Sequence, residues 1–320
     1  MAEPVRAAGI DCGTNSIRLL IADVDQAAGT LRDIDRQMEI VRLGQGVDRR
    51  GWFAPEALER TLAAVARYGR LCRQAGVERL RFVATSATRD AANRNVFLDG
   101  VRAELGVEAE VIDGLEEAHL SFAGAVSALR GRLPAPFLVV DLGGGSTELV
   151  AGRDQAEAAF SMDVGCVRIT ERHLRSDPPT PAQVRAAVAD VDAVLDRAAR
   201  HVPLGAAATL VGVAGSITTV TAHALGLERY DPRRIDGAAL PAARLEEACR
   251  DLWQASRAAR ARLGFMHPGR VDVIGAGALV WSRVLRRVQA ETAAAGRELG
   301  RVVTSEHDIL DGIVLLAAGG

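Results

Sequence analysis

The sequence contains no lysine: all 39 of its basic residues are arginine. This absence excludes several classes of enzyme, because a Walker A loop, a protein kinase and a Schiff-base enzyme each need a lysine amine. The composition is also rich in alanine and glycine, so the bias fits a GC-rich coding sequence better than selection for a function. The exclusion holds whichever cause is right.

An excess of charge of one sign and long apolar runs are lacking as well. The 39 basic and 41 acidic residues leave a net charge of -2, so no global basic field attracts nucleic acid or anionic lipid. No apolar run approaches the roughly 20 residues that span a bilayer. The start MAEPVRAAGIDCG lacks the apolar core of a signal peptide. We therefore expect neither nucleic acid nor a membrane as a partner.

The cysteines and histidines form no metal-binding motif. The four cysteines are scattered and make no C-x-x-C pair, and the six histidines make no H-x-x-x-H or H-E-x-x-H. A zinc site is not indicated. Scattered thiols fit a reducing compartment, so we expect a cytoplasmic protein.

The order of the predicted elements indicates an α/β fold, and a length of 320 residues predicts two domains. Apolar periodicity predicts strands at 6–12, 17–24 and 30–43, then a helix from Pro55 to Gln74. Strands at 80–85 and 108–112 then alternate with helices at 89–105 and 115–129. The second half restarts with strands at 137–143 and 146–152, a strand reading TLVGV, helices near 181–200, 216–225, 241–255 and 270–290, a strand at 301–306 and a final helix.

An internal repeat relates the two halves of the chain. The segment 11–20 aligns without a gap on 141–150, and Asp, Gly, Ser and Leu coincide at four positions. Each copy follows one apolar strand and precedes another, which predicts a tight hairpin whose first strand ends in a carboxylate. The repeat therefore predicts two related α/β domains that face each other across a cleft.

The glycine-rich turns of the two hairpins are candidate phosphate sites, because such turns leave convergent backbone N–H groups uncovered. The candidate residues are Gly13, Thr14, Asn15, Ser16, Gly143, Gly144, Gly145, Ser146 and Thr147. The carboxylates beside them, Asp11, Asp141 and Glu148, are candidate ligands for Mg²⁺, which prefers one or two carboxylates with water and phosphate oxygens. For either motif taken alone, the alternative is an ordinary hairpin with a capping Asp.

Two further segments could bind phosphate. The turn Gly212–Ser216 follows a strand and opens a helix, so Gly215 and Ser216 could hold an anion at the helix N-terminus. An ordinary Ser216 N-cap is at least as compatible with the pattern. The segment ATSATR at 84–89 ends in Arg89, whose guanidinium could contact phosphate. Its alternative is a Ser/Thr helix cap with a solvated arginine.

Adjacent acids at a helix start supply a candidate general base. Asp113 and Glu116 fit a capping box, which gives Glu116 a local structural task. Glu117 has no such task, so it is the better candidate for a base aimed into the cleft. The alternative for Glu117 is an exposed acid that stabilises the helix dipole.

As an ordered series, these motifs resemble the exopolyphosphatase and guanosine pentaphosphate phosphohydrolase family. The segments that carry the resemblance are 11–16, 84–89, 113–118, 141–148 and 212–216, with weaker similarity at 165–168, 270–274 and 305–312. The resemblance implies a duplicated actin-like and sugar-kinase-like (ribonuclease H-like) phosphotransferase fold, with domains at 1–123 and 124–305. The helix 306–320 could join the first domain.

The resemblance also implies Mg²⁺-dependent hydrolysis of a terminal phosphoanhydride, with Mn²⁺ as a possible substitute. It matches Glu117 to the base, Asp141 and Glu148 to the groups that organise metal and water, Asp11 to the first-domain acid, and Arg89 to a phosphate contact. His119 departs from the family, whose members often carry arginine there. The sequence ends before the C-terminal domains of long members, so we expect a preference for short chains.

The sequence leaves the substrate open between inorganic polyphosphate and guanosine pentaphosphate, and a homodimer is possible. Other classes with the same fold also stay open: a sugar or acetate kinase, a nucleotide-dependent chaperone or filament, and a non-catalytic polyphosphate- or alarmone-binding regulator. Glu116–Glu117 and the ATSATR segment favour the hydrolase.

Overall fold

The computed structural model describes residues 3–319 and divides the chain into two compact units. Unit 1 extends to Ala128 and includes the end of the chain from Asp308, and unit 2 is Leu129–His307. The boundary predicted at residues 123 and 124 lies inside a helix, Gly114–Leu129.

Unit 1 is built on a five-stranded sheet of order β3-β2-β1-β4-β5. Its strands are β1 (Val5–Cys12), β2 (Ser16–Asp25), β3 (Thr30–Ile40), β4 (Arg79–Ala84) and β5 (Ala109–Val111). Its helices are α1 (Val47–Arg50), α2 (Pro55–Ala75), α3 (Ser86–Asp90), α4 (Arg94–Leu105), α5 (Gly114–Leu129) and α13 (Ile309–Gly319). Strand β1 pairs antiparallel with β2 and parallel with β4.

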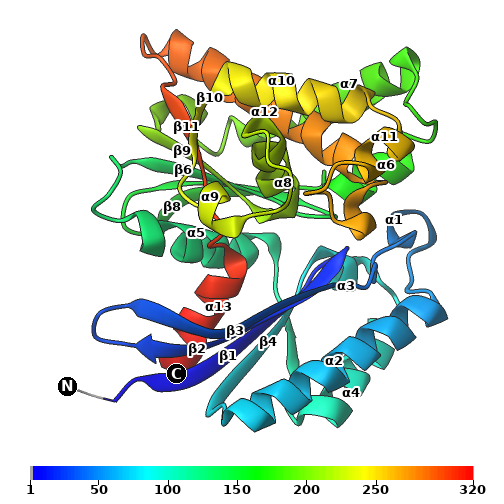
Figure 1. The fold of residues 1–320 in the computed structure, drawn as a ribbon, viewed down its shortest axis with the longest axis vertical. Helices are drawn as coiled ribbons and strands as arrows, with labels where there is room; N and C mark the ends of the chain where they lie inside the picture. The colour runs from blue at the N-terminus through cyan, green and yellow to red at the C-terminus, as the bar shows by residue number, and fades with distance from the viewer. Residues whose placement is uncertain (1–2, 320) are drawn as a thin grey trace. The chain divides into compact units, whose positions relative to one another are not determined.

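Alternation along β1 assigns its two faces to different helices. Ile10 and Cys12 belong to the core formed with α2 and α4, whereas Ala7 packs with α13. Figure 1 shows α13, in red, and α2 on opposite faces of this sheet. Helix α13 approaches β1 closely because Gly9 has no side chain: an added Cβ would lie 2.8 Å from Val314 and 2.9 Å from Ile313.

Unit 2 is built on a six-stranded sheet of order β10-β11-β9-β6-β7-β8. Its strands are β6 (Phe137–Leu142), β7 (Thr147–Gly152), β8 (Ala156–Met162), β9 (Thr209–Val213), β10 (Ala239–Pro241) and β11 (Arg301–Thr304). Its helices are α6 (Cys166–Arg172), α7 (Pro181–Ala198), α8 (Ala214–Ala224), α9 (Pro232–Ile235), α10 (Ala242–Gln254), α11 (Arg257–Ala261) and α12 (Ile274–Ala294), with short 3₁₀ turns η1 (Leu204–Ala206) and η2 (Pro268–Arg270).

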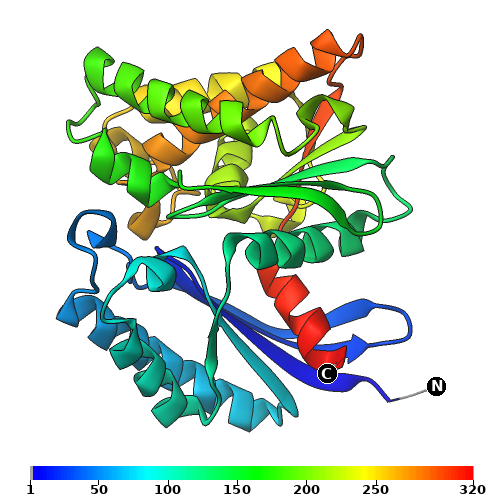
Figure 2. The ribbon, with the colours of Figure 1, turned by 180° about the vertical axis from the view of Figure 1, so that it is seen from behind.

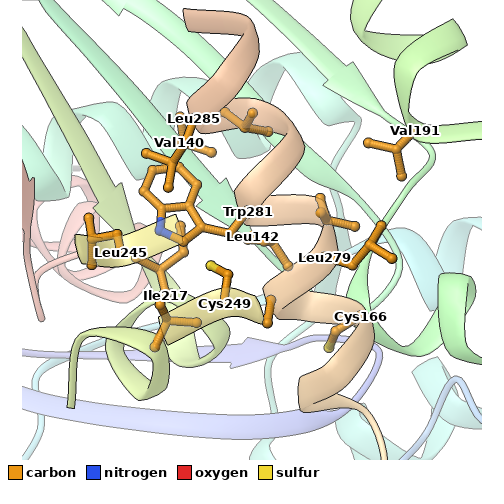
Figure 3. Packing of buried hydrophobic residues seen from close by; sticks show 14 of the residues in the cluster. Val140, Leu142, Cys166, Val191, Ile217, Leu245, Cys249, Leu279, Trp281 and Leu285 are labelled. Atoms are coloured by element: carbon orange, nitrogen blue, oxygen red, sulfur yellow. The ribbon is translucent and has the colours of Figure 1, made fainter. Parts of the chain in front are cut away.

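The core of unit 2 surrounds Trp281 on α12, which is fully buried. Figure 3 shows its indole among Val140 of the sheet, Ile217 of α8 and Leu245 of α10. Figure 2 shows α7, in green, on the same side of the sheet, where it contacts β8. Every residue of β6 is buried, as expected for a strand covered on both faces.

The two sheets share one strand order. The series β3-β2-β1-β4-β5 in unit 1 corresponds to β8-β7-β6-β9-β11 in unit 2, and each begins with two antiparallel pairings followed by a parallel one. This repeated topology is that of the duplicated actin-like α/β fold, which confirms the fold class predicted from the sequence. Among residues 3–319, none of the helices combines the length and apolarity that a bilayer crossing demands.

Several predicted elements need correction. The helix predicted at 89–105 is two helices, α3 and α4, because the chain leaves the helical conformation at Ala91. The helix predicted from residue 270 begins at Ile274, after the turn η2. Strand β8 and helix α6 are not among the elements that the sequence predicts.

Candidate phosphate and cation sites

The first hairpin turn, residues 13–16, is closed and fixed by neighbouring backbone. The N–H of Gly13 donates to the carbonyl of Ser16 at 3.0 Å. The carbonyl of Asn15 accepts from the N–H of Arg42 at 2.9 Å, and Arg42 holds a left-handed φ of 53°. The Thr14 and Ser86 hydroxyls share a buried hydrogen bond of 3.0 Å, which joins this turn to α3 and hence to the ATSATR segment.

The second turn, residues 143–146, repeats this arrangement with a different support. The N–H of Gly143 donates to the carbonyl of Ser146 at 3.0 Å. The carbonyls of Gly143 and Gly144 accept from the first N–H groups of α6, at 3.0 Å from Cys166 and 2.9 Å from Val167. Helix α6 therefore uses its N-terminal N–H groups to hold the turn.

Both turns leave N–H groups that could bind an anion. Within residues 3–319, the structure gives no protein acceptor to the backbone N–H of five turn residues: Thr14, Asn15, Gly144, Gly145 and Ser146. Backbone N–H groups need a partner, and successive uncovered groups in a turn form a nest for phosphate oxygens. These N–H groups are therefore available to phosphate oxygens, as predicted, and no acceptor within the described chain occupies them.

Two carboxylates face each other beside the second turn. Asp141 on β6 and Glu148 on β7 are direct cross-strand partners, so their Cα atoms lie about 5 Å apart on one face of the sheet. Both are buried, at 5% and 1% exposure, and Glu148 also accepts from the Ser161 hydroxyl at 2.7 Å.

This pair fits a hard divalent cation. Mg²⁺ is commonly bound through one or two carboxylates and completes its shell with water and phosphate oxygens. In the described part of the chain, no group of three or more His, Cys, Asp or Glu side chains is placed to hold a metal by itself. A metal at Asp141 and Glu148 would therefore depend on water and substrate for its other ligands.

The same position in unit 1 carries the opposite charge. Asp11 is the cross-strand partner of Arg18, which occupies the place that Glu148 has in the repeat. Arg18 donates to Asp11 through Nη2 at 2.6 Å and also pairs with Asp308. Burial raises the pKa of Asp11 above its ordinary value, and Arg18 opposes that shift. The role of Asp11 as a cation ligand stays a prediction, and its ion pair with Arg18 weighs against it.

The candidate base is distinguished from its neighbour by burial and partner. Glu117 is 8% exposed and accepts from Nη1 of Arg89 at 2.9 Å. The same nitrogen donates to the carbonyl of Ile112 at 2.8 Å, which fixes the guanidinium. The Glu116 side chain is 47% exposed and pairs with Arg81 at 2.9 Å.

The predicted capping box is half correct. The Asp113 carboxylate accepts from the N–H of Glu116 and of Leu115, each at 2.9 Å, so Asp113 does cap α5. These bonds, that of Glu116 first, lower the pKa of Asp113. The Glu116 side chain pairs with Arg81 instead of returning to the cap, because β4 places that arginine within reach.

The turn predicted at Gly212–Ser216 differs from the prediction in one respect. Helix α8 already begins at Ala214, which has a φ of 70°, so Ser216 lies inside the first turn and is not the N-cap. No side chain caps this helix. The guanidinium of Arg270 lies against the Cα of Gly215, and its Nη1 donates to the Gly215 carbonyl at 3.3 Å. An uncapped helix N-terminus beside an arginine suits an anion.

Two arginines at these sites, Arg18 and Arg270, are not among the candidate site residues predicted from the sequence. Arg18 could have been found from the repeat, because it aligns with Glu148 and reverses the charge there. Arg270 lies 54 positions after Ser216 in the chain, and only the fold brings it to Gly215.

A duplicated actin-like fold, with uncovered backbone N–H groups in a turn of each unit and buried acids beside both turns, is typical of proteins that act on phosphoryl groups. The sequence model of the Ppx/GppA phosphatase family matches residues 20–297. Exopolyphosphatase 2 of Mycobacterium tuberculosis is 51% identical over 98% of this chain and 99% of its own length. The chain belongs to the Ppx/GppA phosphatase family.

Solved structures agree with this assignment. The crystal structure of an exopolyphosphatase-like protein is 50% identical, with a TM-score of 0.93 over 97% of this chain and 98% of that one. The PPX-GPPA enzyme of Aquifex aeolicus is 28% identical, with a TM-score of 0.79 over 98% of this chain and 99% of that one.

Proposed function

We propose that this protein is an exopolyphosphatase, which removes orthophosphate from the end of inorganic polyphosphate by hydrolysis. The observation that carries the proposal is the set of uncovered N–H groups in two related turns, accompanied by a buried carboxylate that an arginine orients. Such groups suit a polyanion whose reacting end carries several phosphate oxygens. The similarity to exopolyphosphatase 2 supports the same substrate.

In the proposed reaction, a water molecule attacks the terminal phosphorus in line with the bridging oxygen. Glu117 accepts a proton from this water, the P–O bond to the bridging oxygen breaks, and the shortened polyphosphate leaves with the bonding electrons. Arg89 holds Glu117 in place through its 2.9 Å ion pair. An arginine that donates to one carboxylate oxygen fixes the orientation of the carboxylate, which a general base requires.

The candidate groups are assigned unit by unit. The turn at 13–16, Arg89 and Glu117 belong to unit 1, and the turn at 143–147, the Gly215–Ser216 segment and the carboxylate pair belong to unit 2. Asp141 and Glu148 would hold Mg²⁺ or Mn²⁺, and the ion would neutralise charge that builds on the phosphoryl oxygens. Ser161 keeps Glu148 oriented by donating to its Oε1.

Hydrolysis of guanosine pentaphosphate is the second candidate, because its 5′ end offers the same phosphoanhydride. The proposed location is the cytoplasm: all four cysteines are free and buried, as a reducing compartment allows. The possible homodimer stays a prediction that light scattering of the purified chain tests.

The test of the proposed function is orthophosphate release with Mg²⁺ from four substrates: tripolyphosphate, long polyphosphate, guanosine pentaphosphate and ATP. We expect the highest kcat/KM on polyphosphate and little release from ATP. Release from guanosine pentaphosphate alone would transfer the proposal to the second candidate. Absence of release from all four, combined with measurable polyphosphate binding, would identify a regulator instead of a hydrolase.

A further inference from the structure

Two candidate phosphate sites of unit 2 lie side by side at one edge of its sheet. Strands β6 and β9 are parallel neighbours with Asp141 opposite Val213, so the hairpin turn at 143–146 and the start of α8 leave the sheet next to each other. In the part of the chain that the structure describes, the backbone N–H groups of Gly215 and Ser216 have no protein acceptor, like those of the hairpin turn. Both sites therefore offer donors to phosphate oxygens.

Cys166, the first residue of α6, contacts both sites. Its backbone N–H donates to the Gly143 carbonyl at 3.0 Å, and its thiol shares a hydrogen bond with the Ser216 side chain. The two side chains meet at Gly277 of α12, where an added Cβ would lie 2.4 Å from Ser216 Oγ and 3.3 Å from the Cβ of Cys166. Figure 3 shows Cys166 beside α12. Cys166 thus joins the hairpin turn to the start of α8.

The thiol of Cys166 makes this link without adding a negative charge to a site for anions. Cys166 is 6% exposed, and burial raises the pKa of its thiol above the ordinary value, so the thiol stays protonated at neutral pH. Ser216 is buried to the same extent. Because a buried hydroxyl without a partner is costly, the contact between the two side chains fixes the start of α8 against α6.

A rigid link between the two sites favours a chain of phosphates in particular. Neighbouring phosphoryl groups of polyphosphate share a bridging oxygen, so covalent bonds fix their separation. Two groups of N–H donors bind such neighbours together only when the separation of the donors is fixed as well. Orthophosphate needs one group of donors alone.

We propose that Cys166 is a positioning residue that holds the turn at 143–146 and the start of α8 at the separation that neighbouring phosphoryl groups require. The N–H groups of the two sites bind the ligand, and Cys166 acts through them. The inference rests on the proposed function in its choice of ligand, an inorganic polyphosphate.

The test compares Cys166→Ala with Cys249→Ala. Cys249 is a matched control, because it is a free and fully buried cysteine of the same unit. We expect Cys166→Ala to raise KM for tripolyphosphate about 3- to 10-fold, with kcat within about 3-fold and the inhibition constant of orthophosphate within about 2-fold of wild type. Cys249→Ala should leave all three within about 2-fold.

An unchanged KM in Cys166→Ala would overturn the proposal. An equal rise of KM in Cys249→Ala, or an equal weakening of orthophosphate inhibition in Cys166→Ala, would overturn it too, because either result indicates a general loss of structure. Ser216→Ala breaks the same contact, so its effect on KM should not add to that of Cys166→Ala in the double variant. Additive effects would contradict the link.

If Cys166→Ala fails to fold, Gly277→Ala and Gly275→Ala replace the pair. Both glycines lie on α12, but an added Cβ at Gly275 meets the flexible end of the Arg260 side chain, 2.8 Å away at Nη1, instead of Ser216. Gly277→Ala should therefore raise KM and Gly275→Ala should not. Equal KM values in the two variants would refute the inference.

Failure of the proposed function is visible separately, as a wild-type protein that releases no orthophosphate from tripolyphosphate. In that case calorimetry of tripolyphosphate binding decides the inference with the same variants. Binding that is about 3-fold or more weaker in Cys166→Ala alone supports the positioning role. Equal affinities, or a wild-type protein that does not bind tripolyphosphate, contradict it.

Discussion

Gly165 should tolerate substitution poorly, because it lies directly against the second hairpin turn, residues 143–146. It immediately precedes α6, whose first N–H groups hold the carbonyls of Gly143 and Gly144. An added Cβ at Gly165 would lie 2.5 Å from both the carbonyl carbon and the oxygen of Gly144, and 2.7 Å from the N of Gly145. All three are backbone atoms, so no side chain can rotate away to make room.

The size of the effect follows from this geometry. Ordinary contact begins near 3.4 Å, so α6 and the turn must separate by about 0.9 Å in Gly165→Ala. Overpacking of this kind costs about 1–3 kcal/mol of stability. A displacement of about 1 Å at a positioning element costs up to about 10²-fold in rate. We therefore expect kcat/KM for tripolyphosphate to fall about 10- to 100-fold in a protein that still folds.

The assay combines urea unfolding with initial rates of phosphate release. Gly300→Ala is the control, because Gly300 has no atom within 4 Å of an added Cβ and no left-handed backbone. It should be neutral or slightly stabilising and fully active. A Gly165→Ala protein with wild-type stability and rate would refute the claim that α6 supports the second turn.

Three further predictions concern the metal, the helix cap and the substrate. Asp141→Asn should weaken Mn²⁺ binding, measured by calorimetry, about 10-fold or more while the protein stays folded, and unchanged Mn²⁺ affinity would remove this residue from the cation site. Asp113→Ala should cost about 0.5–2 kcal/mol at pH 7. Because the pKa of Asp113 is lowered on folding, the difference from wild type in urea titrations should begin to shrink as the pH falls below about 4 and should keep shrinking until the pH lies below that lowered pKa. A difference that does not shrink with falling pH would contradict a cap by the ionised carboxylate. With a net charge of -2, the chain offers few basic residues along which a long polyanion could stay bound between cuts. A gel time course should therefore show long polyphosphate shortened gradually, and its binding affinity should fall steeply with rising salt. Full-length chains beside fully degraded ones at substrate excess would instead show processive cutting.

Local patterns in the sequence predicted most of the elements that carry the turns. The repeat at 11–20 and 141–150 predicted both hairpins, and the structure places Asp141 opposite Glu148 as that alignment implies. These predictions succeeded because strand alternation and glycine turns depend on neighbours in the chain. The strand β8 was missed because AEAAFSM is rich in alanine, which has little preference for strands.

Contacts between distant segments could not be predicted in the same way. Arg18 meets Asp308 across 290 positions, and Arg270 reaches Gly215 across 55. Hydrophobic periodicity does not indicate such contacts, because they depend on how each sheet brings the ends of its strands together. The choice of Glu117 over Glu116 as the candidate base stays a prediction. Both acids pair with an arginine, and burial distinguishes them: the Glu117 side chain is 11% exposed and that of Glu116 is 47% exposed.

The central claim is that Glu117 activates the attacking water, and the turnover of Glu117→Gln on tripolyphosphate tests it most directly. Glutamine keeps the shape and an oxygen for Arg89 but cannot accept the proton. We expect kcat to fall about 10²-fold or more with KM within about 3-fold of wild type, whereas Glu116→Gln, which alters an exposed ion pair, should keep wild-type turnover. Wild-type kcat in Glu117→Gln, or a severe loss in Glu116→Gln instead, would contradict the account.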